Sequence, residues 1–107
     1  MQSKWWLPAG VLAGFFSGSL LAQPDALQLR SLAASCANCH GTAGVAQEGM
    51  ESLAGVNRDD LQRKLMDFKT GRKPATVMQQ LTKGYTDEQL AALALHFSQQ
   101  KKPEARP

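Results

Sequence analysis

Two cysteines and a histidine within five consecutive residues are the part of this 107-residue chain best equipped for chemistry. Residues 36–40 read Cys-Ala-Asn-Cys-His, and the sequence contains no further cysteine. A structural disulfide between Cys36 and Cys39 would close a very small loop, and such closely spaced pairs are usually redox-active instead. A thioredoxin-like redox site would need a strand before the motif and a βαβ frame, whereas residues 26–34 are helix formers.

Metal and cofactor binding are the other uses of such a motif. A structural zinc site needs four ligands, and the only other histidine, His96, is far along the chain. The pattern C-x-x-C-H is typical of covalent haem attachment. Each thiol adds to one haem vinyl group, and the next residue places an imidazole under the iron. The motif therefore predicts one covalent haem c, bound through Cys36 and Cys39, with His40 as an axial iron ligand.

The second axial ligand has four candidates after the motif. Met66 lies inside an expected helix and is interpreted as a core residue, while His96 is interpreted as a rim or solvent residue of the last helix. Met50 follows His40 closely and would need its loop to fold back around the haem edge. Met78 follows a proline turn and has the reach to cross to the opposite haem face, so it is the preferred ligand. A soft, neutral thioether favours Fe(II), and two filled axial positions favour electron transfer over catalysis.

The first 22 residues have the composition of an export signal. Lys4 precedes an apolar run from Trp5 to Leu21, and small residues come before a plausible cut after Ala22. An uncleaved membrane anchor is the alternative, although the run is at the short limit for a span. We expect a signal peptide over residues 1–22 and a cytochrome domain over residues 23–107, located in the periplasm.

Removing that segment leaves a chain with few large apolar side chains. Its only aromatic residues would be Phe68, Tyr85 and Phe97. Chains this small usually need a disulfide, metal or cofactor to complete a core, and a porphyrin would supply the missing bulk. Without Lys4, basic residues outnumber acidic ones by 11 to 9 and spread from Arg30 to Arg106, so the sequence lacks the clustered basic patch of a nucleic-acid-binding protein.

The elements that must position these groups are expected to be helices. Periodicity and breakers predict helices over about Ala26–Ser35, Arg58–Thr70 and Thr76–Lys83, and a last one from Thr86 that Pro103 closes. Residues 41–55 are loop-like because four glycines interrupt them. No strand alternation is evident in the sequence, so the expected fold is all-α, built around the haem.

Local signals support the helix boundaries. Asp25 and Asn57 are suitable N-caps, and Thr86 with Gln89 forms a capping-box pattern. Gly71 is placed to terminate the second helix. The predicted buried face of the last helix consists of Leu90, Leu93, Ala94 and Phe97.

Several stretches together resemble class I bacterial c-type cytochromes, and most of all the cytochrome subunit of flavocytochrome c sulfide dehydrogenase. They are C-A-N-C-H-G-T-A-G at 36–44, L-A-G at 53–55, F-K-T-G-R-K-P-A-T-V-M at 68–78 and K-G-Y-T-D-E-Q-L-A-A-L-A at 83–94. The resemblance implies a class I cytochrome c fold, thioether bonds at Cys36 and Cys39, and His40 and Met78 as axial ligands. It also implies a flavoprotein partner that oxidises sulfide and passes electrons to the cytochrome, which relays them to another periplasmic redox protein.

The sequence departs from that family pattern before the Leu-Ala-Gly stretch. Such cytochromes usually carry a proline there, but this chain has none between Pro24 and Pro74, and Glu51 or a neighbour occupies the region. The carbonyl that orients His40 is therefore open at this point. A free-standing electron carrier feeding a terminal oxidase is the alternative function, and a haem sensor or small peroxidase is a third.

Overall fold

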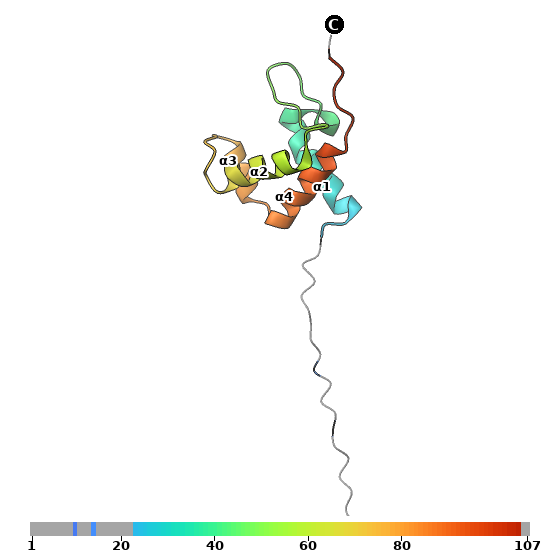
Figure 1. The fold of residues 1–107 in the computed structure, drawn as a ribbon, viewed down its shortest axis with the longest axis vertical. Coiled ribbons are helices and arrows are strands. Elements are labelled where there is room, and N and C mark those ends of the chain that lie inside the picture. Colours follow the sequence, from blue (N-terminus) through green and yellow to red (C-terminus); the bar gives the residue numbers. More distant parts are fainter. Residues whose placement is uncertain (1–9, 11–13, 15–22, 106–107) are drawn as a thin grey trace, which may run out of the picture.

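The computed structural model describes Gly10, Gly14 and residues 23–105. Apart from those two glycines, the predicted signal segment lies outside the described residues. The described chain consists of helices, namely α1 (Ala26–His40), the 3-10 turn η1 (Thr42–Gly44), α2 (Arg58–Lys69), α3 (Met78–Lys83) and α4 (Asp87–Ser98) (Figure 1). No strand occurs among residues 23–105, which confirms the all-α prediction.

The helix starts are set by local caps, as predicted. The Asp25 carboxylate accepts a hydrogen bond from the Gln28 amide (2.8 Å), and the Gln28 side chain accepts one from the Asp25 amide (3.2 Å). Thr86 and Gln89 make the same reciprocal pair at the start of α4. The Asn57 side chain accepts hydrogen bonds from two amides in the first turn of α2. These bonds satisfy amides that have no partner within their helix.

The first helix is longer than the prediction. It continues past Ser35 through the cysteine motif and ends at His40, where Gly41 adopts a left-handed conformation with φ 78°. A Cβ at Gly41 would lie 1.8 Å from the Val45 carbonyl oxygen, so this turn requires glycine. The motif carries no apolar periodicity from which a helix could be recognised, although nothing in it breaks one.

Two other boundaries also differ. Helix α3 begins at Met78 rather than Thr76, and α4 ends at Ser98, well before Pro103. The predicted role of Pro103 is therefore wrong. The chain leaves α4 through a tightened last turn in which the Gln100 amide donates to the Phe97 carbonyl (3.1 Å).

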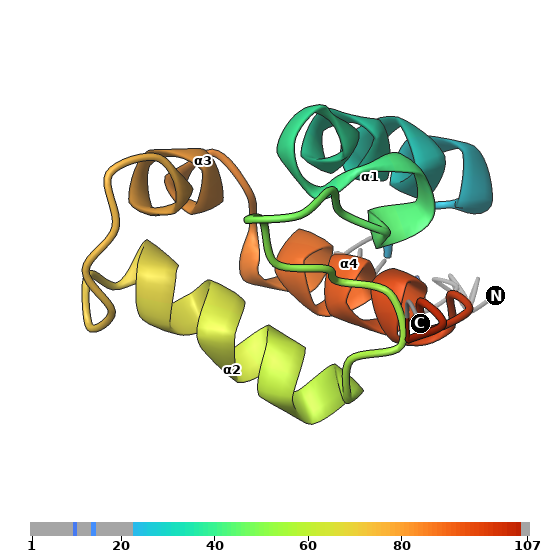
Figure 2. The same cartoon turned by 90° about the horizontal axis from the view of Figure 1, so that it is seen from above.

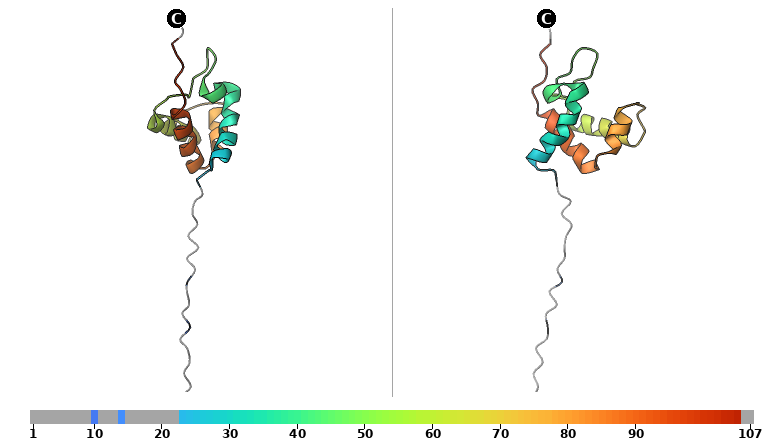
Figure 3. Two further views of the ribbon diagram at one scale, coloured as in Figure 1. Left: turned by 90° about the vertical axis from the view of Figure 1, so that its right-hand side faces the viewer. Right: turned by 180° about the vertical axis from the view of Figure 1, so that it is seen from behind.

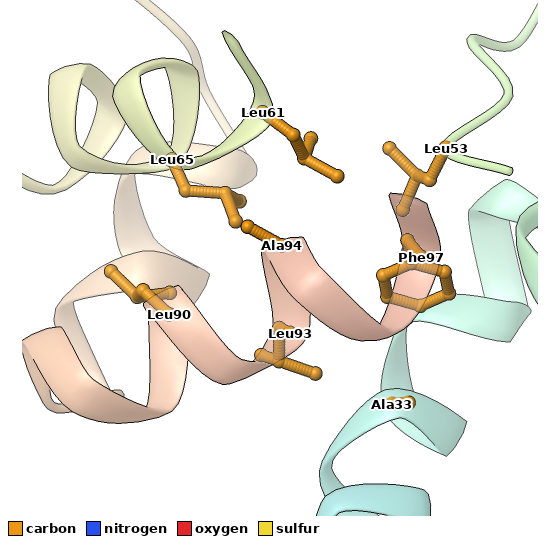
Figure 4. Close-up of a cluster of buried hydrophobic side chains, with 8 residues drawn as sticks. All are labelled: Ala33, Leu53, Leu61, Leu65, Leu90, Leu93, Ala94 and Phe97. Carbon is orange, nitrogen blue, oxygen red and sulfur yellow. The ribbon is translucent and has the colours of Figure 1, made fainter. Parts of the chain in front are cut away.

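Helix α4 forms the centre of the packing. Figure 2 shows α1 and α2 on opposite sides of α4, with α3 beside the end of α2. The predicted buried face of α4 is confirmed, since its members are 0–3% exposed: Leu90, Leu93, Ala94 and Phe97. In Figure 4, Leu65 of α2 points at Ala94, and Leu53 lies over the Phe97 ring.

A loop without regular structure joins η1 to α2 and projects from the end of the molecule that also carries the C-terminal segment (Figure 3). Its base is fastened to the core at Gly44, whose carbonyl accepts hydrogen bonds from the amides of Leu53 (2.8 Å) and Ala54 (3.1 Å). A Cβ at Gly44 would lie 2.8 Å from the Phe97 ring. Within the described part of the chain, no helix is long and apolar enough to cross a membrane.

Candidate cofactor site

The last turns of α1 present three reactive side chains to one cavity. Cys36, Cys39 and His40 follow an i, i+3, i+4 spacing, which places them on one helix face. All three line a cavity of about 380 Å³, and Met78 at the start of α3 lines it too. The volume falls within the range of about 300–1,000 Å³ that is usual for ligand pockets. The four predicted site residues are therefore brought together.

The cavity wall is mostly apolar, and all four α-helices contribute to it. Leucines and a phenylalanine of the core form its floor, namely Leu53, Leu61, Leu65, Leu90, Leu93 and Phe97. The segment around α3 adds Ala75, Val77 and Leu81. Such a surface suits a large, flat, apolar ligand, because burying it removes apolar area from water.

Three hydroxyl groups of the wall have partners within the protein. The Thr82 hydroxyl donates to the Met78 carbonyl oxygen at 2.7 Å, and the Tyr85 hydroxyl lies 2.7 Å from Ser35 Oγ. Among the described residues, no buried side-chain nitrogen or oxygen lacks a hydrogen-bond partner. The cavity side chains that can coordinate a metal through nitrogen or sulfur are His40, the two cysteines and the two methionines Met50 and Met78.

The imidazole of His40 is oriented by the loop that follows α1. Its Nδ1 lies 2.6 Å from the backbone carbonyl oxygen of Glu51. A carbonyl can only accept a hydrogen bond, so Nδ1 carries the proton and the Nε2 lone pair is available to a metal. Glu51 therefore supplies the carbonyl that orients His40, which the sequence alone did not identify.

The two cysteines are free thiols, with Cys36 half-buried and Cys39 exposed. Burial raises the pKa of Cys36 above its ordinary value, while a hydrogen bond from Ser35 opposes the shift to a smaller extent. Redox-active C-x-x-C pairs have a lowered thiol pKa. The direction of the shift therefore disfavours a thioredoxin-like role.

The remaining candidate ligands are separated by the fold. Met66 packs against the core and does not line the cavity, in agreement with its interpretation as a core residue. His96 makes an edge-to-face contact with Phe97, with ring centroids 5.1 Å apart, and is also outside the lining. Met50, which the sequence disfavoured, does line the cavity because its loop folds over it.

Tyr85 and Glu51 were not singled out as cofactor-site residues by the sequence. Tyr85 belongs to the K-G-Y stretch, so a signal existed, but its contact with α1 depends on the tertiary fold. The Glu51 carbonyl is a backbone group, and no residue type marks it.

The donor set fits a haem. An imidazole and a thioether can fill two axial positions, and the porphyrin brings its own four nitrogens. Among residues 23–105, no three His, Cys, Asp or Glu side chains gather into a group that could hold a bare metal ion. The apolar wall suits the macrocycle, and the two thiols of the C-x-x-C-H motif line the same cavity.

Comparison with known proteins also supports a haem-binding protein. No protein-family model matches the chain. The chain is 39% identical over 66 residues to the cytochrome subunit of sulfide dehydrogenase from Chlorobaculum tepidum, covering 62% of this chain and 60% of that protein. It is 31% identical over 112 residues to the thiosulfate dehydrogenase electron acceptor of Stutzerimonas stutzeri, covering 97% of this chain and 51% of the relative.

A third relative matches over nearly its full length. Cytochrome c-553 of Helicobacter pylori is 32% identical over 98 residues, which cover 90% of this chain and 96% of that protein. The fold and site define a small all-α protein whose apolar cavity is lined by two thiols, an imidazole and a thioether, and the chain belongs to the c-type cytochromes. As such it carries covalently bound haem c, and the sequence contains one C-x-x-C-H motif to attach it. It spans 60% and 51% of the first two relatives.

Proposed function

We propose that this cytochrome transfers single electrons in the periplasm as the haem subunit of a flavoprotein sulfide dehydrogenase. In this proposal Cys36 and Cys39 form the thioether bonds, and His40 and Met78 are the axial iron ligands. The observation that carries the site assignment is that all four side chains line one apolar cavity.

Each residue contributes a separate property to that site. The bound haem supplies a redox centre that changes by one electron at a time. Cys36 and Cys39 retain it covalently, which a chain with so small a core could not do by burial alone. His40, with its proton held on Nδ1 by Glu51, offers Nε2 as a basic ligand. Met78 offers a neutral sulfur that favours the reduced iron.

The cavity wall also affects electron transfer. The core leucines and Phe97 keep water from the site. A low dielectric around a charged centre makes its reduction potential sensitive to nearby ligands and hydrogen bonds. The chain therefore binds the haem, orients its ligands and excludes water from it. Electron transfer requires no proton donor in the cavity wall.

The flavoprotein partner is supported by similarity to a sulfide dehydrogenase cytochrome subunit. A flavin that oxidises sulfide gains two electrons, and a one-electron acceptor must take them in successive events. A second candidate is a free carrier that feeds a terminal oxidase. The full-length match to cytochrome c-553 favours that alternative, because the relative's name specifies no enzyme subunit.

Export through a signal peptide over residues 1–22 is part of the same proposal, with residues 23–107 as the mature cytochrome. N-terminal sequencing of the purified holoprotein should begin near Gln23. A chain beginning at Met1 would indicate an uncleaved anchor instead.

Affinity capture of the tagged holoprotein from its native periplasm tests the partner. We expect a flavoprotein to co-purify and added sulfide to reduce the haem within that complex. An unrelated c-type cytochrome carrying the same tag is the control. Recovery of the cytochrome alone, with no reduction by sulfide, would favour the free carrier.

A further inference from the structure

The residue that orients His40 belongs to an irregular loop. Glu51 is exposed and lies outside any helix, and the sequence contains no proline between Pro24 and Pro74. Gly49, two residues earlier, adopts φ 88° with no atom near its Cβ position. Such a segment does not by itself hold a carbonyl oxygen at a fixed distance from an imidazole.

Hydrogen bonds hold the loop on both sides of Glu51, and before it the Met50 amide donates to the Gln47 carbonyl at 3.2 Å. Ser52 Oγ accepts a hydrogen bond from the Ala46 amide at 2.9 Å, and the Gly44 carbonyl accepts one from the Leu53 amide. These bonds lie on the side of the loop nearest the core. None of them involves Glu51 itself.

The side chain of Glu51 attaches this part of the loop to α2. Its carboxylate forms an ion pair with Nζ of Lys64, which belongs to α2. The Lys64 side chain is 30% exposed, and Glu51 is 56% exposed, so the pair is partly screened rather than buried. One residue thus contacts His40 through its carbonyl and α2 through its carboxylate.

We propose that the Glu51–Lys64 ion pair is a positioning device that holds the Glu51 carbonyl on His40 Nδ1 and so tunes the basicity of the His40 ligand. This inference rests on the proposed role of His40 as an axial ligand. A hydrogen bond to Nδ1–H raises the basicity of a ligating imidazole. A more basic ligand stabilises oxidised iron, so the intact pair lowers the reduction potential.

The sign of the change in reduction potential distinguishes a positioning role of the ion pair from a direct effect of its charges on the haem. Removing a positive charge near the haem lowers the potential, and removing a negative charge raises it. Loosening the carbonyl from His40 raises the potential whichever partner is removed. Lys64→Met therefore distinguishes the two effects. The loss of positive charge would lower the reduction potential, whereas the loss of positioning would raise it.

The experiment is redox titration of the purified holoprotein and of Lys64→Met, Glu51→Gln and Lys64→Arg. We expect the potential to rise in the first two variants and to stay near wild type in Lys64→Arg, which can keep the pair. Arg63→Met is the matched charge control, because Arg63 neighbours Lys64 on α2 and pairs with Asp60 instead. Its potential should fall slightly or stay unchanged.

A second measurement follows the hydrogen bond directly. In NMR spectra of the reduced holoprotein, the Nδ1 proton of His40 should exchange with solvent up to about fivefold faster in Lys64→Met, the size expected for a partly exposed ion pair. A fall in potential like that of Arg63→Met, with unchanged exchange, would overturn the inference. The proposed function fails separately, if the wild-type spectrum lacks histidine–methionine ligation.

Discussion

The hydroxyl of Tyr85 lies 2.7 Å from Ser35 Oγ, so a hydrogen bond joins residues 50 positions apart across the rim of the cofactor cavity. It connects the turn between α3 and α4 with the helix that carries both cysteines. The same turn is held from α2, because Lys69 Nζ donates to the Tyr85 carbonyl (2.7 Å) and pairs with Asp87 (2.6 Å). Both α1 and α2 are thus hydrogen-bonded to Tyr85.

Tyr85→Phe removes the hydroxyl and keeps the ring. We expect the free energy of unfolding to fall by about 1 kcal/mol, the typical net contribution of such a hydrogen bond. Denaturant titration of the holoprotein measures it. Ser35→Ala should cost a similar amount, and the double variant should cost less than the sum. Full additivity would show that the two hydroxyls do not interact.

Met78→Ala tests the second axial ligand. The oxidised holoprotein should lose the weak far-red band that arises from sulfur bound to ferric iron. Met50→Ala is the matched control, because Met50 is the other thioether lining the cavity. That variant should keep the band. The opposite pattern would transfer the ligand role to Met50.

Leu90→Ala tests the core beneath the cavity. Leu90 is 1% exposed, and truncating a buried leucine costs about 2–5 kcal/mol of unfolding free energy. Leu95→Ala, on the same helix but 42% exposed, should cost under about 1 kcal/mol. Equal losses in the two variants would contradict the packing of α4 described above.

Gly41→Ala tests the turn that ends α1 next to His40. The new Cβ would clash with the Val45 carbonyl and would sit on a left-handed residue, so haem incorporation and stability should both fall sharply. Gly49→Ala is the control, since its φ is also positive but no atom lies nearby. Backbone strain alone should cost it about 1–2 kcal/mol. Comparable yields of the two holoproteins would argue against the clash.

The sequence alone determined the features that depend on neighbours in the chain. The C-x-x-C-H spacing, the capping boxes and the buried face of α4 are all local patterns, because a helix brings residues three and four apart together. The hydrogen bonds between Asp25 and Gln28 and between Thr86 and Gln89 do not depend on the rest of the fold. The continuation of α1 through His40 was missed because the motif has no apolar periodicity to indicate it.

Only the tertiary structure decided which distant groups meet at the cavity. The acceptor of His40 is a backbone carbonyl in an irregular loop, and every residue has such a group. Met50 lines the cavity because of the path that its loop takes. The loop contains glycines with positive φ, and the local sequence does not determine that path. The meeting of Tyr85 with Ser35 likewise requires α4 to pack on α1. These contacts follow from burying one shared apolar core, a condition that no short stretch of sequence expresses.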